Sequence, residues 1–172
     1  MFPKKIESNW LLLEELKPKW SVAKRVYRAI CRNREEFSPW LDRVFDIDSA
    51  RSEFKFIWRK FFSDEIEYWI YWKWSFIWCI WLFNIDDLSS RAELWIWLDG
   101  GYTGHGHMTD AVKLLLENVW FSRIEAKIDQ ENLKSRAVLY RCGFQYEWTL
   151  HRYRFSPFFK RNRTMDLFAL LK

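Results

Sequence analysis

Glycine and cysteine are both scarce in this sequence. Its 172 residues include 5 glycines and 3 cysteines, whereas an average glycine usage of about 7% predicts roughly 12. The cysteines, Cys31, Cys79 and Cys142, are odd in number and lack paired spacing, which argues against a disulfide framework. No apolar run follows Met1, so we expect a cytoplasmic protein without a signal peptide.

A long apolar run free of charge is also missing. The nearest candidate, residues 68–83, is shorter than the roughly 20 residues that cross a bilayer. It contains Lys73 and is rich in Trp and Tyr, which prefer the membrane interface. Its aromatic and β-branched content fits two strands that turn near Lys73 and Trp74. We therefore expect no membrane partner.

The overall composition is that of a globular protein. Hydrophobic residues make up 49% of the chain and charged residues 30%, with a formal net charge of +5. These values exclude a disordered chain, and the length suits one domain over residues 1–172. The modest positive excess suits an anionic cofactor and leaves nucleic-acid binding open as an alternative.

Hydrophobic periodicity predicts a mixed α/β fold. Strands are predicted at 6–16, at 91–98, at 123–128, at 144–153, at 164–171 and twice within 68–83. Helices are predicted at 19–32, around the stripe of Phe54, Ile57 and Trp58, at 108–119, and from Asn132 to Gly143, with a loop at 33–46. Alternation in the 91–98 strand places Ile96 on one face and Glu93 and Trp95 on the other.

Four of the five glycines lie between the 91–98 strand and the helix that starts near Met108. The sequence there is GGYTGHGHM, beginning at Gly100. Glycine lets backbone N–H groups approach a phosphate closely, and a helix start adds unpaired N–H donors and partial positive charge. The segment predicts either a pyrophosphate cradle or a tight loop without a ligand. It matches neither the G-x-G-x-x-G fingerprint nor the Gly-Lys-Ser/Thr of a P-loop.

Two segments, YTGHGHMTDA at 102–111 and SRIEAKIDQENLKSRAVLYRCGF at 122–144, resemble the GNAT acetyltransferase superfamily. The branch that they resemble is that of the RimJ/RimL-like ribosomal-protein N-terminal acetyltransferases, and the likeness extends from NREEFSPWL to MDLFALL. The resemblance implies a bacterial α/β protein with a central, mostly antiparallel, twisted sheet. Six to seven strands and about four helices are expected, with the sheet splayed at a cofactor cleft. It also implies acetyl-CoA as the co-substrate.

The resemblance further implies which residues bind the cofactor. The family loop reads Gln/Arg-x-x-Gly-x-Gly/Ala, and Thr103 and Met108 depart from its first and last positions. Because the backbone makes most of these contacts, we expect the loop to keep its role. An Asn-x-x-Ser motif before a helix is matched by Asn132 and Ser135. The expected cofactor-binding residues are Ile96, Thr103, Gly104, His105, Gly106, His107, Met108, Thr109, Asn132 and Ser135.

The reaction of the family is direct transfer of acetyl from the thioester to an amine. Glu93 is the expected general base, acting through water; the alternative is an ordinary strand carboxylate that faces solvent. Ser135 is expected to protonate the thiolate or to bond the pantetheine, unless it is only a first-turn helix residue. Many family members have a tyrosine four residues later as general acid. Here Leu139 stands at that position and Tyr140 follows it.

The expected acceptor is a primary amine. An α-amine has a pKa of about 8, whereas that of lysine is about 10.4, so a protein N-terminus, as in a ribosomal protein, is the easier nucleophile. A small amine (polyamine or antibiotic) and a non-catalytic nucleic-acid-binding module are alternatives. Residues 33–47 and 153–163 are expected to select the acceptor. We predict a monomer or homodimer without nucleic acid and without metal, since His105 and His107 lack further ligands.

Tryptophan is abundant, with 13 residues. Six lie where the family, or the geometry of a tight turn, requires glycine. Our hypothesis is that these are UGA codons translated as tryptophan although the source organism reads them as glycine. The alternative is a truly tryptophan-rich or designed sequence. Restoring the six would bring the glycine count close to the average. The positions are Trp74, Trp78, Trp81, Trp95, Trp120 and Trp148.

Overall fold

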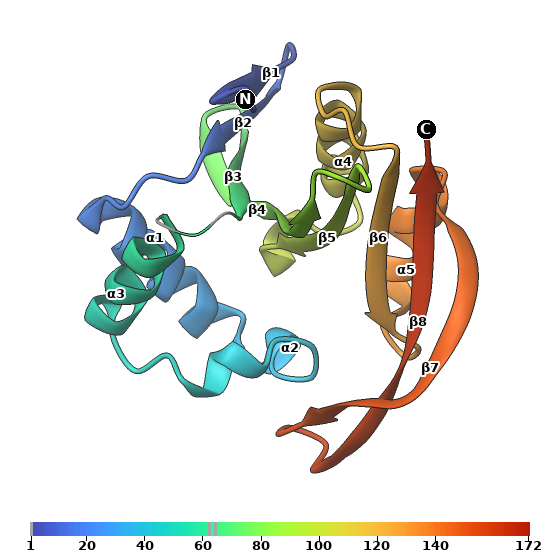
Figure 1. Cartoon of the computed structure of the whole chain (residues 1–172). Coiled ribbons are helices and arrows are strands. Elements are labelled where there is room, and N and C mark those ends of the chain that lie inside the picture. Colours follow the sequence, from blue (N-terminus) through green and yellow to red (C-terminus); the bar gives the residue numbers. More distant parts are fainter. Residues whose placement is uncertain (1, 62, 64) are drawn as a thin grey trace.

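The computed structural model describes residues 2–61, 63 and 65–172 (Figure 1). Its strands are β1 (Lys5–Glu7), β2 (Leu11–Glu15), β3 (Ile66–Trp72), β4 (Ser75–Asp86), β5 (Arg91–Leu98), β6 (Arg123–Asp129), β7 (Gln145–Ser156) and β8 (Arg161–Leu171). Its α-helices are α1 (Trp20–Arg32), α2 (Arg34–Phe37), α3 (Ala50–Phe61), α4 (His107–Glu117) and α5 (Leu133–Arg141). Two 3-10 helices are η1 (Asp42–Phe45) and η2 (Gly100–Tyr102).

The strands of the described chain form one eight-stranded sheet in the order β1-β2-β3-β4-β5-β6-β8-β7. Neighbouring strands run antiparallel except β5 and β6. The predicted mostly antiparallel α/β fold is confirmed, with one strand more than the upper prediction. That strand arises because residues 6–16 form a hairpin, in which the Ser8 N–H donates to the Leu11 carbonyl at 2.8 Å. The additional helix is α2, one turn within the predicted loop.

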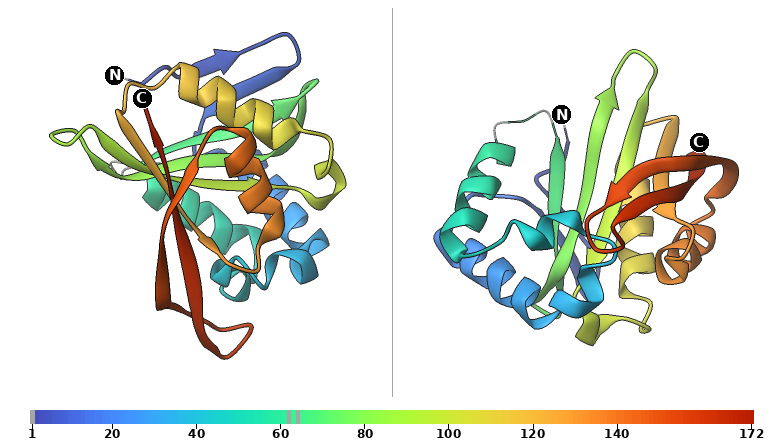
Figure 2. Two further views of the ribbon diagram at one scale, coloured as in Figure 1. Left: turned by 90° about the vertical axis from the view of Figure 1, so that its right-hand side faces the viewer. Right: turned by 90° about the horizontal axis from the view of Figure 1, so that it is seen from below.

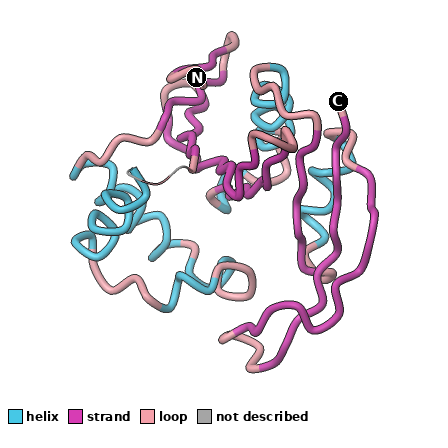
Figure 3. Tube along the Cα trace, in the orientation of Figure 1, coloured by secondary structure: helices cyan, strands magenta, loops and turns pink. Residues whose placement is uncertain are grey.

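Helices cover both faces of the sheet (Figures 2 and 3). Helices α4 and α5 join a core that includes Leu94 and Leu139, with Ile96 packed against it. Helices α1, α2 and α3 cover the opposite face, where Phe37 is buried and Trp95 packs against the second core. The predicted alternation in β5 is therefore confirmed, because Leu94 and Ile96 face one core and Trp95 faces the other.

Strands β5 and β6 pair only at their beginnings. The parallel ladder joins Arg91–Glu93 to Arg123–Glu125 and ends there. Beyond Glu93, β5 continues beside β4, while β6 stays paired with β8 along its whole length. The two halves of the sheet therefore separate after this joint, as the resemblance implies for a cofactor cleft, and Figure 1 shows the two strands diverging.

Residues 68–83 lie in β3 and β4, and the chain turns at Lys73 and Trp74 as predicted. Both turn residues have positive φ, 44° at Lys73 and 68° at Trp74. A two-residue type I′ turn requires positive φ at both positions, and glycine or asparagine usually supplies it. No helix of the described residues is long and apolar enough to cross a membrane.

Trp78 has an unusual backbone within β4. Its φ is 145°, and it adjoins a bulge, because Ile70 pairs with Trp78 while Tyr71 pairs with Phe76. Positive φ is a genuine outlier for a bulky side chain, and bulges of this kind commonly use glycine. Within the described chain, Trp74 and Trp78 are the only tryptophans with positive φ. Both belong to the six predicted glycine positions, which supports that hypothesis at these two sites; at the other four it stays a prediction.

Candidate active site

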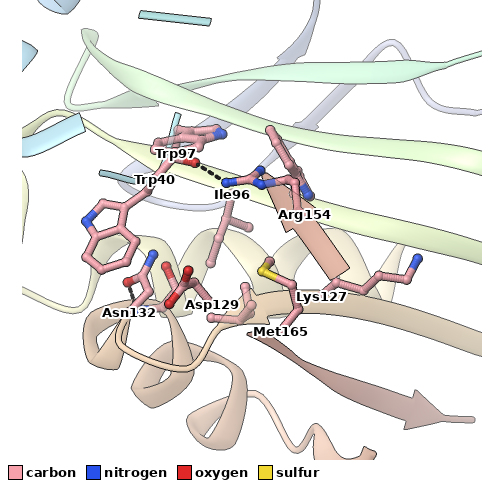
Figure 4. A pocket seen from close by; sticks show the side chains of 11 residues that line it. Trp40, Ile96, Trp97, Lys127, Asp129, Asn132, Arg154 and Met165 are labelled. Atoms are coloured by element: carbon pink, nitrogen blue, oxygen red, sulfur yellow. Dashed lines mark hydrogen bonds between the residues drawn. The ribbon is translucent and has the colours of Figure 1, made fainter. Parts of the chain in front are cut away.

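A cleft opens where β5 and β6 diverge (Figure 4). It contains about 440 Å³ of empty space, including the part open to solvent. Three predicted site residues line it, together with Lys127 and one residue from each of the two segments expected to select the acceptor. These six residues are Ile96, Asn132 and Ser135, and Trp40, Lys127 and Arg154.

Two left-handed glycines shape the loop between β5 and α4. Gly104 and Gly106 have φ of 83° and 84°, a conformation that costs little only without a Cβ. Thr103 is turned into the loop, since its N–H and Oγ donate to the Gly100 carbonyl at 3.2 and 2.9 Å. The amide N–H groups of residues 104–109 have no acceptor among the described residues. This run of free donors at a helix start fits a phosphate group.

The side chains of this loop contact the protein itself. Met108 lies in the core beneath α4, and the Thr109 Oγ accepts a hydrogen bond from the Arg141 Nε at 3.1 Å. The ring of His107 packs against the ring of Trp72 at a tilt of 37°, with centroids 4.2 Å apart. Burial lowers the pKa of His107 below its ordinary value. These three side chains are therefore occupied by the protein itself, and cofactor binding by the loop backbone stays a prediction.

The two loop histidines do not belong to a larger group of metal ligands. The rings of His105 and His107 lie 5.8 Å apart, and His105 is exposed. Among the described residues, no three His, Cys, Asp or Glu side chains are grouped so that they could hold a metal ion. The Nδ1 of His107 is buried and has no hydrogen-bond partner in this part of the structure.

The start of α5 places Asn132 and Ser135 at the cleft. The Asn132 Oδ1 accepts a hydrogen bond from the Ser135 N–H at 3.1 Å, so Asn132 caps its own helix. Neither the Asn132 amide nitrogen nor the Ser135 hydroxyl bonds to another described residue. Both groups line the cleft, and they are free to bond a ligand there.

Glu93 is buried, so its alternative as a strand carboxylate facing solvent is wrong. Its side chain is paired, because Oε2 accepts from the Asn84 Nδ2 at 3.1 Å and from the Lys127 Nζ at 2.5 Å. Burial by itself lowers the pKa of Lys127, but the hydrogen bond and charge attraction to Glu93 outweigh it, so that the pKa is raised. Glu93 does not line the cleft directly, whereas Lys127 does. The ion pair between Glu93 and Lys127 therefore connects Glu93 to the cleft.

Sequence reasoning did not single out Lys127 or Arg154, although Arg154 lies in a segment that was expected to select the acceptor. Lys127 comes from β6 and Arg154 from β7. Asp129 also lines the cleft, and both of its carboxylate oxygens accept from the buried Arg163 at 2.8 Å. Alternation along β6 shows which residues share a face, but it does not show that β7 brings Arg154 to the cleft or that β8 brings Arg163 to Asp129.

Comparison with known proteins agrees with this geometry. A family model described as an acetyltransferase (GNAT) domain matches residues 11–145. A relative from Bacillus subtilis (strain 168), named "Putative ribosomal N-acetyltransferase YdaF", is 28% identical over 156 residues, covering 86% of this chain and 84% of the relative.

Solved structures share the fold. The RimL ribosomal L7/L12 alpha-N-protein acetyltransferase in complex with coenzyme A matches with a TM-score of 0.89 at 17% identity, covering 97% of both chains. The microcin C7 self-immunity acetyltransferase MccE, solved with acetyl-CoA and AMP, has a TM-score of 0.84 at 20% identity, over 96% of this chain and 94% of that one. At these identities the likeness shows the fold alone.

The family match covers most of the chain and includes β5, the glycine loop, α4, β6 and α5. GNAT acetyltransferases use acetyl-CoA, which is the co-substrate that the resemblance implied. The alternative of a non-catalytic nucleic-acid-binding module is set aside. The chain belongs to the GNAT family of N-acetyltransferases.

Proposed function

We propose that this enzyme transfers the acetyl group of acetyl-CoA to a primary amine, and that its acceptor is the α-amine of a protein N-terminus. One observation carries the proposal: β5 and β6 separate into a cleft beside a helix start whose amides have no partner among the described residues. The names of YdaF and RimL support a ribosomal protein as the acceptor.

The loop amides of residues 104–109 would hold the diphosphate of acetyl-CoA at the start of α4. The thioester arm would then extend into the cleft between β5 and β6, past Ile96, Asn132 and Ser135. Backbone N–H groups of β5 that are not used by β4 would stabilise the oxyanion formed at the thioester carbonyl.

In the reaction, the amine nitrogen bonds to the thioester carbonyl carbon, and the carbon–sulfur bond breaks. The nitrogen must lose one proton and the departing thiolate must gain one. Holding both reactants in one cleft supplies a large share of the rate enhancement. An α-amine is also the easier nucleophile near neutral pH, because its pKa of about 8 leaves part of it uncharged.

We assign the proton-removing step to Glu93, acting through water. Its Oε2 is occupied by Asn84 and Lys127, whereas its Oε1 has no hydrogen bond to the described residues. A carboxylate oxygen that remains open can accept a proton relayed from the cleft. We assign protonation of the thiolate to Ser135, whose hydroxyl is unoccupied and lines the cleft.

The proposal is tested by incubating the purified chain with acetyl-CoA and a panel of acceptors. Intact mass spectrometry should show a gain of one acetyl group on peptides with a free N-terminus and none on N-terminally blocked peptides. The same assay with polyamines and aminoglycosides tests the small-amine alternative. Acetylation of the small amines alone would contradict the choice of acceptor, and no thermal shift with acetyl-CoA or coenzyme A would contradict the enzymatic proposal itself.

A further inference from the structure

The end of the β7–β8 hairpin contains the net positive charge of the whole chain. Residues 151–163, HRYRFSPFFKRNR, include five Lys or Arg and no Asp or Glu. The chain has 28 Lys or Arg and 23 Asp or Glu, so the rest of it contains 23 residues of each sign and no net charge. We call residues 151–163 the basic hairpin. In Figure 1 it extends past the end of β6 and below α2.

Three of the five basic side chains already have a carboxylate partner. These pairs are Arg154–Asp42, Arg161–Glu131 and Arg163–Asp129. The other two, Arg152 and Lys160, form no ion pair with the described residues. Both are exposed, so that a partner from solution can reach them. The basic hairpin therefore offers two accessible cations to an anion from outside the chain.

The basic hairpin lies directly beside the cleft. Arg154 lines the cleft, and the ring of Phe159 faces Trp40, another cleft residue, with centroids 6.3 Å apart. Ser156, the last residue of β7, is two residues beyond Arg154, which is about 7 Å along a strand. A peptide whose N-terminus reacts in the cleft would therefore pass the basic hairpin with the residues that follow.

Two accessible cations suit carboxylates on the acceptor better than a nucleic acid. A nucleic-acid site often neutralises about six to ten phosphates, and a single exposed ion pair contributes little binding free energy. A carboxylate on the acceptor is held near the hairpin once the α-amine is in the cleft, so that weak pairs are enough to distinguish acceptors. An extended peptide advances about 3.3 Å per residue, which brings its third to sixth residues to the hairpin.

We propose that the basic hairpin binds acidic residues near the N-terminus of a peptide acceptor, through Arg152 and Lys160. The acidic residues are at about the third to sixth positions, as the strand spacing indicates. This inference rests on the proposed function and deepens it, because it names the chemical class of the acceptor: a peptide with an acidic N-terminal segment.

The test uses two peptides with the same first two residues. One has Asp or Glu at the next four positions, and the other has Asn or Gln there. For the wild type at low salt, the acidic peptide should have a KM about three- to tenfold lower, as expected for two exposed ion pairs. Arg152→Gln combined with Lys160→Gln should remove most of this difference. Salt at about 0.5 M should do the same, because it screens exposed charges.

Lys17→Gln combined with Arg28→Gln is the matched control. Both residues are exposed, neither lines the cleft, and neither forms an ion pair with a described residue. This variant loses the same charge as the hairpin variant, so it should keep the preference for the acidic peptide. Loss of the preference in the control as well would show an effect of net charge and would overturn the inference.

Reversal of the two charges gives a readout that a structural role does not. Arg152→Glu combined with Lys160→Glu should prefer a peptide with lysines at the third to sixth positions over the acidic peptide. Equal wild-type KM values for the acidic and neutral peptides overturn the inference, as does an acidic preference that the Gln variant keeps. A single-stranded RNA oligonucleotide that binds the wild type but not the Gln variant, while the acidic peptide has no advantage, overturns it in favour of a nucleic-acid partner.

Peptide binding without turnover separates this inference from the proposed function. Calorimetry with the enzyme saturated with coenzyme A measures peptide affinity when no acetyl group is present. Tighter binding of the acidic peptide by the wild type than by the Gln variant supports the inference even if the enzyme acetylates no peptide. Equal binding by the two refutes it, whatever the enzyme acetylates.

Discussion

At Trp78 a large indole is attached to a backbone that glycine adopts most easily. The ring is buried between Phe37 and Phe76, with centroid distances of 5.3 and 6.0 Å, while φ is 145°. Trp69 on the neighbouring strand is equally buried, with 4% of its surface exposed at each residue, and its φ is not positive. The two tryptophans therefore differ in backbone conformation at matched burial.

This matched pair gives a prediction for single substitutions. Removing a large buried aromatic side chain costs about 3–5 kcal/mol, but at Trp78 glycine also relieves a backbone strain of about 1–3 kcal/mol. Both substitutions lower the free energy of unfolding. The loss in Trp78→Gly should be smaller than the loss in Trp69→Gly by at least about 1 kcal/mol. Urea denaturation of both variants measures the difference. Equal losses of unfolding free energy in the two variants would contradict the inference, drawn from the backbone conformation, that glycine is the natural residue at position 78.

Glu93 gives a second prediction at the residue scale. Glu93→Gln keeps the shape and the bond to Asn84 but removes the proton acceptor, so kcat should fall by about 100-fold or more. The Kd for coenzyme A, from calorimetry, should not change. Glu125→Gln on the adjacent strand is the control, since Glu125 is paired with Arg123 at 2.6 Å and has no assigned role. Similar kcat values for both variants would exclude Glu93 as the base.

At the scale of elements, the predictions succeeded where a strong periodicity was present. Strand β5, helix α4 and strand β6 lie within one or two residues of their predicted bounds. The β1–β2 turn was missed although Ser8 and Asn9 are residues that favour turns, because no glycine or proline accompanies them. Helix α2 was missed because four residues are too few to show a helical repeat.

The site was predictable to the extent that it is local in sequence. The glycine loop and the start of α5 are continuous segments, so their motifs could be read directly. Lys127, Arg154 and Trp40 reach the same cleft from three separate elements, and no spacing rule connects them. The ion-pair partner of buried Glu93 is likewise Lys127, which comes from β6, beyond η2 and α4 in the chain.

The glycine loop gives a prediction for the element that it forms. A Cβ at Gly106 meets no atom within 4 Å, so the obstacle to alanine is the φ of 84° and not space. Gly106→Ala should cost about 1–2 kcal/mol of conformational strain and weaken coenzyme A binding. Gly101→Ala is the control, because its φ is not positive and its nearest contact is at 3.9 Å. Calorimetric Kd values that are equal for the two variants would contradict a phosphate-binding loop.

The start of α4 also makes stability depend on pH. The pKa of His107 is lowered in the folded chain, so the unfolded chain takes up the proton first, near its ordinary pKa of about 6.5. Stability should therefore fall as the pH drops below this value, until the folded histidine also titrates. His107→Gln should make the melting temperature less dependent on pH between about 7 and 5. An unaltered slope in His107→Gln would contradict this assignment.

At the scale of the whole molecule, the six predicted glycine positions are spread over both halves of the sheet. Two are in the β3–β4 turn and its bulge, Trp95 lines the cleft, and Trp148 is at an irregularity of the β7 ladder. That residues 1–172 form one cytoplasmic N-acetyltransferase domain, as a monomer or homodimer, stays a prediction.

Replacing all six tryptophans by glycine should improve both the folding of the protein and its affinity for acetyl-CoA. Overpacking and strain would be relieved at several sites, and the cleft would lose the indole of Trp95. We expect a higher soluble yield and a lower Kd for acetyl-CoA than in the tryptophan-bearing chain, measured by soluble expression and calorimetry. The gene sequence gives an independent check, since all six codons should be UGA. No gain in either measurement would refute the decoding hypothesis.

Three rungs of parallel ladder, from Arg91–Glu93 to Arg123–Glu125, connect the two halves of the sheet at β5 and β6. On either side, long antiparallel pairs hold each half together. A molecule bound between β5 and β6 would contact both halves of the sheet and hold them together across this short pairing. The molecule would then leave only when the two halves of the sheet move apart. The lifetime of the complex would therefore depend on how often they do so.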